Sequence, residues 1–101
     1  MNWHDFIICF FSGAFAANAV PHFVYGIAGD RFPTPFAHPP GKGLSSPRVN
    51  VLWALCNIVA CYALFHIGHV WDGGLAAHAS FFAGVALLGI FSSGHFAQRQ
   101  R

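Results

Sequence analysis

The sequence predicts an all-α integral membrane protein, a helical bundle with three transmembrane helices in a single membrane domain of residues 1–101. The chain is 55% hydrophobic and only 8% charged, whereas soluble domains carry about 25% charged residues. Three apolar runs without Asp, Glu, Lys or Arg cover residues 6–27, 49–70 and 75–97. At about 1.5 Å per residue, each run extends roughly 33 Å, enough to cross a hydrocarbon core of about 30 Å. We therefore expect each run to form one membrane-spanning helix, because only helices satisfy their own backbone in lipid.

The first run, residues 6–27, also contains small residues in "AFAANA" that resemble a signal-peptidase site. No Lys or Arg precedes Arg31, so the basic region that begins a signal peptide is missing. We expect this run to be a retained helix.

Polar side chains form one stripe along this first helix. Asn18, His22 and Tyr25 are four and three residues apart, so they share a helix face. Pro21 removes the helical hydrogen bond to the carbonyl of Ala17. The freed carbonyl and Asn18 can bind water, a proton or a polar substrate group, as broken transporter helices do. Alternatively, Asn18 stabilises a kink and His22 bonds to the following loop. Asn18, His22 and Tyr25 are candidate residues for binding a polar ligand or lipid.

The segment "DRFPTPFAHPPGKGLSSPR", residues 30–48, contains five of the six prolines and the basic residues Arg31, Lys42 and Arg48. Prolines restrict the backbone and the segment has apolar anchors, so we expect an ordered cap. It is not a phosphate loop of the Walker type, because Lys42 is followed by Gly43 instead of Ser or Thr. The three basic residues are candidates for binding a lipid phosphate. General attraction to anionic lipid is the simpler explanation.

The basic residues also predict the orientation of the chain. Three lie in the cap and two, Arg99 and Arg101, follow the third helix, whereas the N-terminus and the loop of residues 71–74 carry none. Basic residues collect on the cytoplasmic side of membrane proteins. We therefore expect a multi-pass protein of the inner (plasma) membrane, with its N-terminus outside, its C-terminus inside and a cytoplasmic cap.

Histidines cluster near the predicted outer end. His66 and His69 are three residues apart on the predicted second helix, and the next turn brings His78 to a similar depth. Three imidazoles can hold Zn, Cu, Fe or Ni, and a histidine pair can ligate haem. Alternatively, these side chains reach headgroups or water near the membrane surface. A metal or haem cofactor at His66, His69 and His78 is therefore possible, but the sequence does not identify one.

Several residues predict contacts beyond one chain. Asn57 lies about two turns inside the second helix, where it needs a hydrogen-bonding partner. The third helix carries small residues at Ser80 and Gly84, and again at Gly89 and Ser93. We expect a homo-oligomer or a subunit of a larger membrane complex, in contact with membrane lipid, and no nucleic-acid partner.

The stretch "PHFVYGIAGDRFPTPFAHPPGKGLSSP", residues 21–47, is followed by "VNVLW". It resembles a family of small bacterial membrane proteins without an assigned activity. The resemblance implies that the stripe from His22 and the cap form one unit. It implies no activity, cofactor or partner.

Three classes of function remain open. We favour a small polytopic inner-membrane protein that acts as an oligomeric or accessory subunit, with a lipid- or partner-binding cytoplasmic cap. The first alternative is a membrane-embedded redox protein, or one that modifies lipid or quinone, using histidine-bound metal or haem. The second alternative is a small-solute or proton-coupled transporter. Proton relays usually include an acidic residue, and no predicted span contains one.

Overall fold

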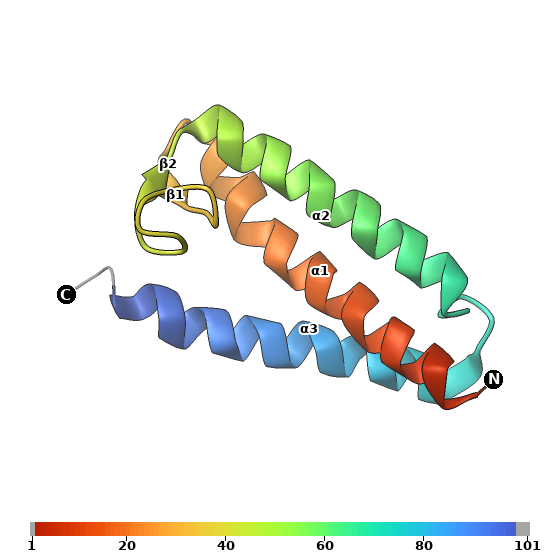
Figure 1. Ribbon diagram of the computed structural model, residues 1–101. Coiled ribbons are helices and arrows are strands. Elements are labelled where there is room, and N and C mark those ends of the chain that lie inside the picture. The colour runs from red at the N-terminus through yellow and green to blue at the C-terminus, as the bar shows by residue number, and fades with distance from the viewer. Residues whose placement is uncertain (1, 99–101) are drawn as a thin grey trace.

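The computed structural model describes residues 2–98, which form three long helices and one short hairpin (Figure 1). All three helices are long and apolar enough to cross a membrane. The prediction of three long apolar helices is therefore confirmed. The elements in chain order are α1 (Trp3–Ile27), β1 (Phe32–Pro33), β2 (Leu44–Ser45), α2 (Pro47–Ile67) and α3 (Gly74–Ala97).

Side-chain caps determine where α1 and α2 begin. The side chain of Asn2 accepts backbone hydrogen bonds from the first turn of α1, and the carboxylate of Asp5 accepts one from the N–H of Asn2 at 3.2 Å. This reciprocal capping box starts α1 earlier than its apolar run does. In α2, Ser46 is the cap and Pro47 is the first helical residue. Arg48, which the sequence placed at the end of the cap, therefore lies in the first turn of α2.

Helix α1 lies between α2 and α3, which make little contact with each other (Figure 1). The closest approach of α1 and α3 is made possible by two glycines. A Cβ atom at Gly84 would lie 1.8 Å from the carbonyl oxygen of Phe10, and one at Gly13 would lie 1.9 Å from that of Phe81. Gly84, which was predicted to face another chain, thus packs against α1 of its own chain.

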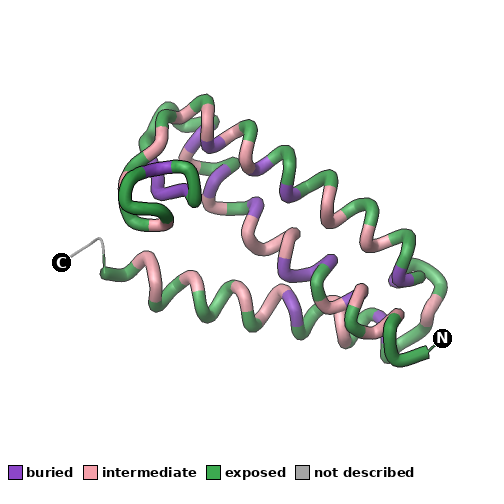
Figure 2. The backbone as a smooth tube through the Cα atoms, in the orientation of Figure 1, coloured by how far each residue is buried: buried purple, intermediate pink, exposed green. Residues whose placement is uncertain are grey.

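Burial is concentrated on α1 and on the faces turned toward it (Figure 2). In α2 the three buried residues are Asn50, Ala54 and Asn57, so two of them are amides. The outer faces of α2 and α3 expose large apolar side chains, such as Val59 at 68% and Ile90 at 70%. Helices that are apolar on every side are typical of membrane spans.

The cap was predicted as residues 30–48, whereas the segment between α1 and α2 covers residues 28–46, and the name is used for this segment from here on. The cap is folded against one end of the bundle, where α1 ends, α2 begins and α3 ends (Figure 1). Its two short strands pair antiparallel, with Phe32 opposite Ser45 and Pro33 opposite Leu44. The hydroxyls of Thr34 and Ser45 form a further hydrogen bond between the two arms. The cap is therefore a compact part of the fold with its own internal pairing.

Candidate functional site

The centre of the cap end is Asn50 of α2, whose side chain is fully buried. Its Nδ2 atom donates to the carbonyl oxygens of Phe32 at 3.0 Å, Ser45 at 3.2 Å and Ser46 at 3.0 Å. Its Oδ1 atom lies 2.8 Å from Nδ1 of His22 on α1. One amide thus joins the irregular backbone of the cap to two helices.

This network determines which nitrogen of His22 carries a proton. The three surrounding carbonyls require the NH₂ group of Asn50 to face the cap, so its oxygen faces His22. Because an amide oxygen only accepts, Nδ1 of His22 is the donor. In the neutral imidazole, Nε2 is then a hydrogen-bond acceptor. His22 is 2% exposed, and its ring meets the ring of Phe32 edge-on at 5.4 Å.

A second pair of amides lies deeper along the same interface. Nδ2 of Asn18 donates to Oδ1 of Asn57 at 3.0 Å, and Nδ2 of Asn57 donates to the carbonyl oxygen of Trp53 at 2.8 Å. Beyond them, the hydroxyl of Ser12 donates to the carbonyl oxygen of Cys61 at 2.8 Å. The partner that Asn57 requires is therefore within its own chain, and the prediction of an external partner for this residue is wrong.

An inner cavity of about 180 Å³ lies between α1, α2, α3 and the cap. It is lined mainly by aromatic, proline and aliphatic side chains, and none of its described lining residues is Asp, Glu, Lys or Arg. Its polar side chains come from α1 (Asn18 and His22), the cap (Thr34) and α3 (Ser92 and His95). Six of its lining residues are Asn18, His22, Trp53, Leu88, Phe91 and Phe96.

The indole N–H of Trp53 is the unusual group in this wall. Within residues 2–98, Nε1 of Trp53 is the one buried side-chain nitrogen or oxygen that has no hydrogen-bond partner. Burying such a donor unpaired costs about 1–3 kcal/mol. Its ring lies 6.5 Å from the ring of His22, measured between centroids. Trp53 and His22, the residues that carry this donor and the acceptor Nε2, both line the inner cavity.

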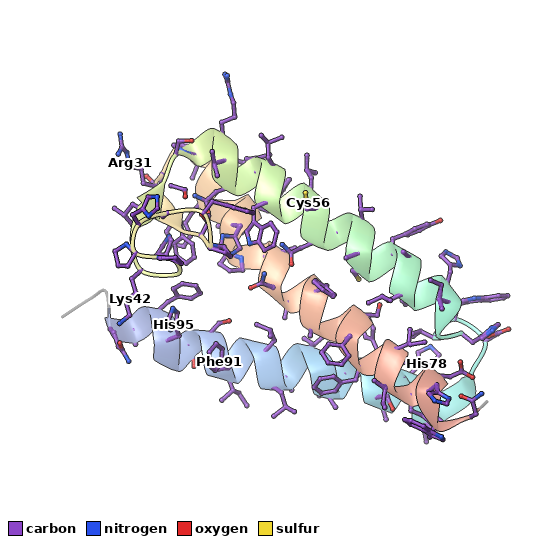
Figure 3. All side chains as sticks on the ribbon, in the orientation of Figure 1. Arg31, Lys42, Cys56, His78, Phe91 and His95 are labelled. Atoms are coloured by element: carbon purple, nitrogen blue, oxygen red, sulfur yellow. The ribbon has the colours of Figure 1, made fainter. Side chains whose placement is uncertain are left out.

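An outer cavity of about 230 Å³ lies next to the inner one, at the end of the bundle. Lys42 and Gln98 line it, together with residues that it shares with the inner cavity. Nε2 of His95 on α3 donates to the carbonyl oxygen of Gly41 at 2.8 Å, which attaches the cap to α3. Figure 3 shows Lys42 and His95 together at this end of the bundle and His78 at the opposite end.

The predicted ligand residues of the stripe and cap separate into two groups. Asn18 and His22 line the inner cavity. Tyr25 stacks on Phe32 of the cap, with ring centroids 4.5 Å apart. Arg31 and Arg48 are exposed and, within the described chain, neither lines the inner or the outer cavity. Among the three basic candidates, Lys42 is the one that lines the outer cavity of the described chain. The helix α1 continues through Pro21 without a break.

The three candidate metal or haem ligands have separate neighbours. Helix α2 ends at Ile67 instead of residue 70, so His69 lies in the following turn with φ of 60° and does not share a helix face with His66. His69 pairs with Asp72 at 3.4 Å, and Nδ1 of His78 lies 2.7 Å from the carbonyl oxygen of Gly74. Among residues 2–98, no group of three His, Cys, Asp or Glu is placed to hold a metal ion. Metal or haem binding at these histidines stays a prediction.

The predicted site omits Asn50, Trp53 and His95. A signal for the first two is present in the sequence, since Asn50, Trp53 and Asn57 follow the three- and four-residue spacing of one helix face. His95 bonds a cap residue 54 positions away, so no local pattern predicts its contact.

Comparison with known proteins gives no match to a family model, a curated protein or a solved structure. The resemblance to small bacterial membrane proteins therefore stays a prediction, and the geometry of the chain itself carries the functional interpretation.

Proposed function

We propose that this chain is a multi-pass inner-membrane protein that acts as an oligomeric or accessory subunit, with a cytoplasmic cap that binds anionic lipid. Three apolar helices support the membrane location. The placement of Arg31, Lys42 and Arg48 at the cap end supports a cytoplasmic cap, with the N-terminus outside and the C-terminus inside. Arg99 and Arg101, which support the same orientation, lie outside the described residues.

The observation that carries the lipid proposal is the mixed surface of the cap. Phe36 and Leu44 are 62% and 53% exposed although Asn50 holds the cap backbone in place. Arg31, Lys42 and the neighbouring Arg48 are exposed at the same end of the chain. Exposed apolar side chains beside basic ones fit the boundary between acyl chains and anionic headgroups. Each basic residue near such a surface contributes about 1 kcal/mol to the free energy of binding to anionic lipid.

The outer faces of α2 and α3 support the subunit role. They expose large apolar side chains, among them Val59 and Phe82. A second copy of the chain or a larger membrane protein would cover these faces.

Lipid retention tests the cap proposal directly. The protein is purified in mild detergent, incubated with equal amounts of phosphatidylglycerol and phosphatidylcholine, and analysed by native mass spectrometry. We expect the unchanged protein to retain phosphatidylglycerol preferentially, and we expect a variant combining Arg31→Gln, Lys42→Gln and Arg48→Gln to lose that preference. Asp72→Asn, which changes a charge at the opposite end, is the matched control. Equal retention of both lipids by the unchanged protein would contradict the proposal.

Reporter fusions test the orientation. A fluorescent protein that matures in the cytoplasm should fluoresce when fused to the C-terminus, and alkaline phosphatase fused there should remain inactive. The reverse pattern would place the cap outside and remove its access to the cytoplasmic leaflet.

A further inference from the structure

Two residues that line the inner cavity carry hydrogen-bonding groups that a ligand can use. Trp53 supplies a buried N–H for which the described chain has no acceptor. His22 supplies Nε2, because Asn50 accepts the proton on its Nδ1 atom. A hydroxyl group both accepts and donates, so it satisfies the two together. The lone amide oxygen of Asn18, whose NH₂ group donates to Asn57, is a second acceptor in the same wall.

The size and walls of the cavity select the body of the ligand. Its volume of about 180 Å³ is close to that of cavities, about 150 Å³, which bind a benzene ring. Trp53, Phe91 and Phe96 supply aromatic surface, and Leu88 supplies aliphatic surface. None of the described lining residues is an acid, a lysine or an arginine, which favours an uncharged head. Apolar walls with a few placed polar groups are typical of small-molecule sites.

A neighbouring cavity provides apolar space next to the inner cavity. It has a volume of about 300 Å³, lies between α1 and α3, and shares Asn18 and Leu88 with the inner cavity. Its remaining lining residues, Phe11, Ala14 and Phe15, are all apolar, and Phe11 is half-exposed on the outer surface of the bundle. A hydrocarbon tail attached to a ring in the inner cavity can therefore continue between the two helices toward the outside of the bundle.

We propose, building on the membrane location in the proposed function, that the inner cavity binds the uncharged ring of a lipid-soluble phenol or hydroquinone. The ring hydroxyl donates to Nε2 of His22, and its oxygen accepts from the indole N–H of Trp53. The apolar tail lies between α1 and α3, along Phe11 and Leu88. This site is separate from the basic surface of the cap, because Arg31 and Arg48 line none of these described cavities.

The experiment uses 4-decylphenol and the matched probe decylbenzene, which lacks the hydroxyl. In a background with Trp3→Phe and Trp71→Phe, Trp53 is the remaining tryptophan and reports binding by its fluorescence. We expect saturable binding of decylphenol to the full chain in detergent, about tenfold tighter than binding of decylbenzene. Equal affinities for the two probes would overturn the proposal. Absence of saturable decylphenol binding would also overturn it.

A second arm removes the donor and keeps the aromatic ring. Calorimetry on Trp53→Phe, in the otherwise unchanged protein, should show about tenfold weaker binding of decylphenol and unchanged binding of decylbenzene. An unchanged affinity for decylphenol would overturn the role of the indole N–H. If this variant does not fold, the comparison of the two probes on the folded protein still decides the proposal.

A third arm separates this site from the lipid-binding cap. Arg31→Gln combined with Arg48→Gln should leave decylphenol affinity unchanged even where phosphatidylglycerol retention falls. Phenol binding without lipid preference would refute the cap proposal alone, and lipid preference without phenol binding would refute the cavity proposal alone.

Discussion

At the cap end of the bundle, His22 and Asn50 are 2% and 0% exposed and are bonded to each other, whereas at the opposite end His69 and Asp72 form a pair with half-exposed side chains. Near that opposite end the helices pack against each other through apolar side chains, and Cys9 is fully buried in this core. The two ends therefore use polar residues differently: one buries them as connectors, and the other leaves them at the surface.

The difference follows from the backbone that each end must satisfy. The cap is irregular, and its carbonyls at Phe32 and Ser45 turn inward, where a buried group requires a hydrogen bond. Asn50 supplies the donors, and its own oxygen then needs His22. At the opposite end the chain turns in six residues, 68–73, and its polar side chains remain exposed. The buried pair of His22 and Asn50 accordingly accompanies attached irregular backbone, whereas the exposed His69 does not.

Among these substitutions, replacement of Asn50 should destabilise the cap end of the bundle most strongly. Asn50→Leu removes the donors to three carbonyls and leaves Nδ1 of His22 unpaired, so we expect the free energy of unfolding to fall by about 2–3 kcal/mol. Hydrogen exchange should accelerate throughout residues 28–46. Asn57→Leu is the matched control, because it removes the hydrogen bond with Asn18 but no hydrogen bond to the cap. Unchanged exchange in the cap of Asn50→Leu would contradict the role of this residue as the connector.

A larger side chain at the contact between α1 and α3 tests the part of the bundle away from the cap. There, close packing of the two helices, and not buried polar side chains, holds the structure together. Gly84→Ala introduces a Cβ atom against the backbone of Phe10, and we expect the free energy of unfolding to fall by about 2 kcal/mol. Gly89→Ala, on the same helix but in open space, should be neutral or raise it by up to about 1 kcal/mol. Denaturation in mixed micelles measures both. Equal effects of the two substitutions would mean that α1 and α3 do not pack closely.

Two histidines of α3 provide a test within one helix. His95→Leu leaves the carbonyl of Gly41 without its donor, so we expect a loss of about 1 kcal/mol in the free energy of unfolding and faster tryptic cleavage after Lys42. His78→Leu removes a bond only to its own helix and should change the free energy by no more than about 0.5 kcal/mol. Cleavage after Lys42 at the same rate in both variants would show that His95 does not hold the cap.

The smallest effect belongs to the exposed pair of the opposite end. Asp72→Asn should change the free energy of unfolding by less than about 0.5 kcal/mol, because His69 and Asp72 are accessible to water and salt. Thermal unfolding at low and high salt measures this. A loss comparable to that of Asn50→Leu would remove the distinction between the two ends.

The sequence predicts the three helices well because each is one uninterrupted apolar run, and run length alone determines whether a helix can cross a membrane. The stripe of Asn18 and His22 follows from helical spacing and does reach a shared cavity. The starts of the helices differ by a few residues, because caps such as Asn2 and Ser46 lie in polar sequence outside the apolar runs.

Pairing between helices is what the sequence does not predict. Spacing places Asn57 on a face of α2, but only packing shows that Asn18 of α1 meets that face. The same-face prediction for His66 and His69 is wrong because α2 ends one residue before Gly68. The left-handed residue that ends this helix is His69 and not Gly68, so the usual glycine signal for a helix end does not mark it directly.

The state of His22 is the most direct test, because it links the cap to the cavity. Nitrogen-15 NMR of the imidazole, recorded near neutral pH on protein in nanodiscs, distinguishes a protonated ring nitrogen from an unprotonated one. We predict a proton on Nδ1, an unprotonated Nε2, and a change in the Nε2 signal when 4-decylphenol is added. A proton on Nε2 with a bare Nδ1 would contradict the bond to Asn50, and with it the connection between the cap and the site.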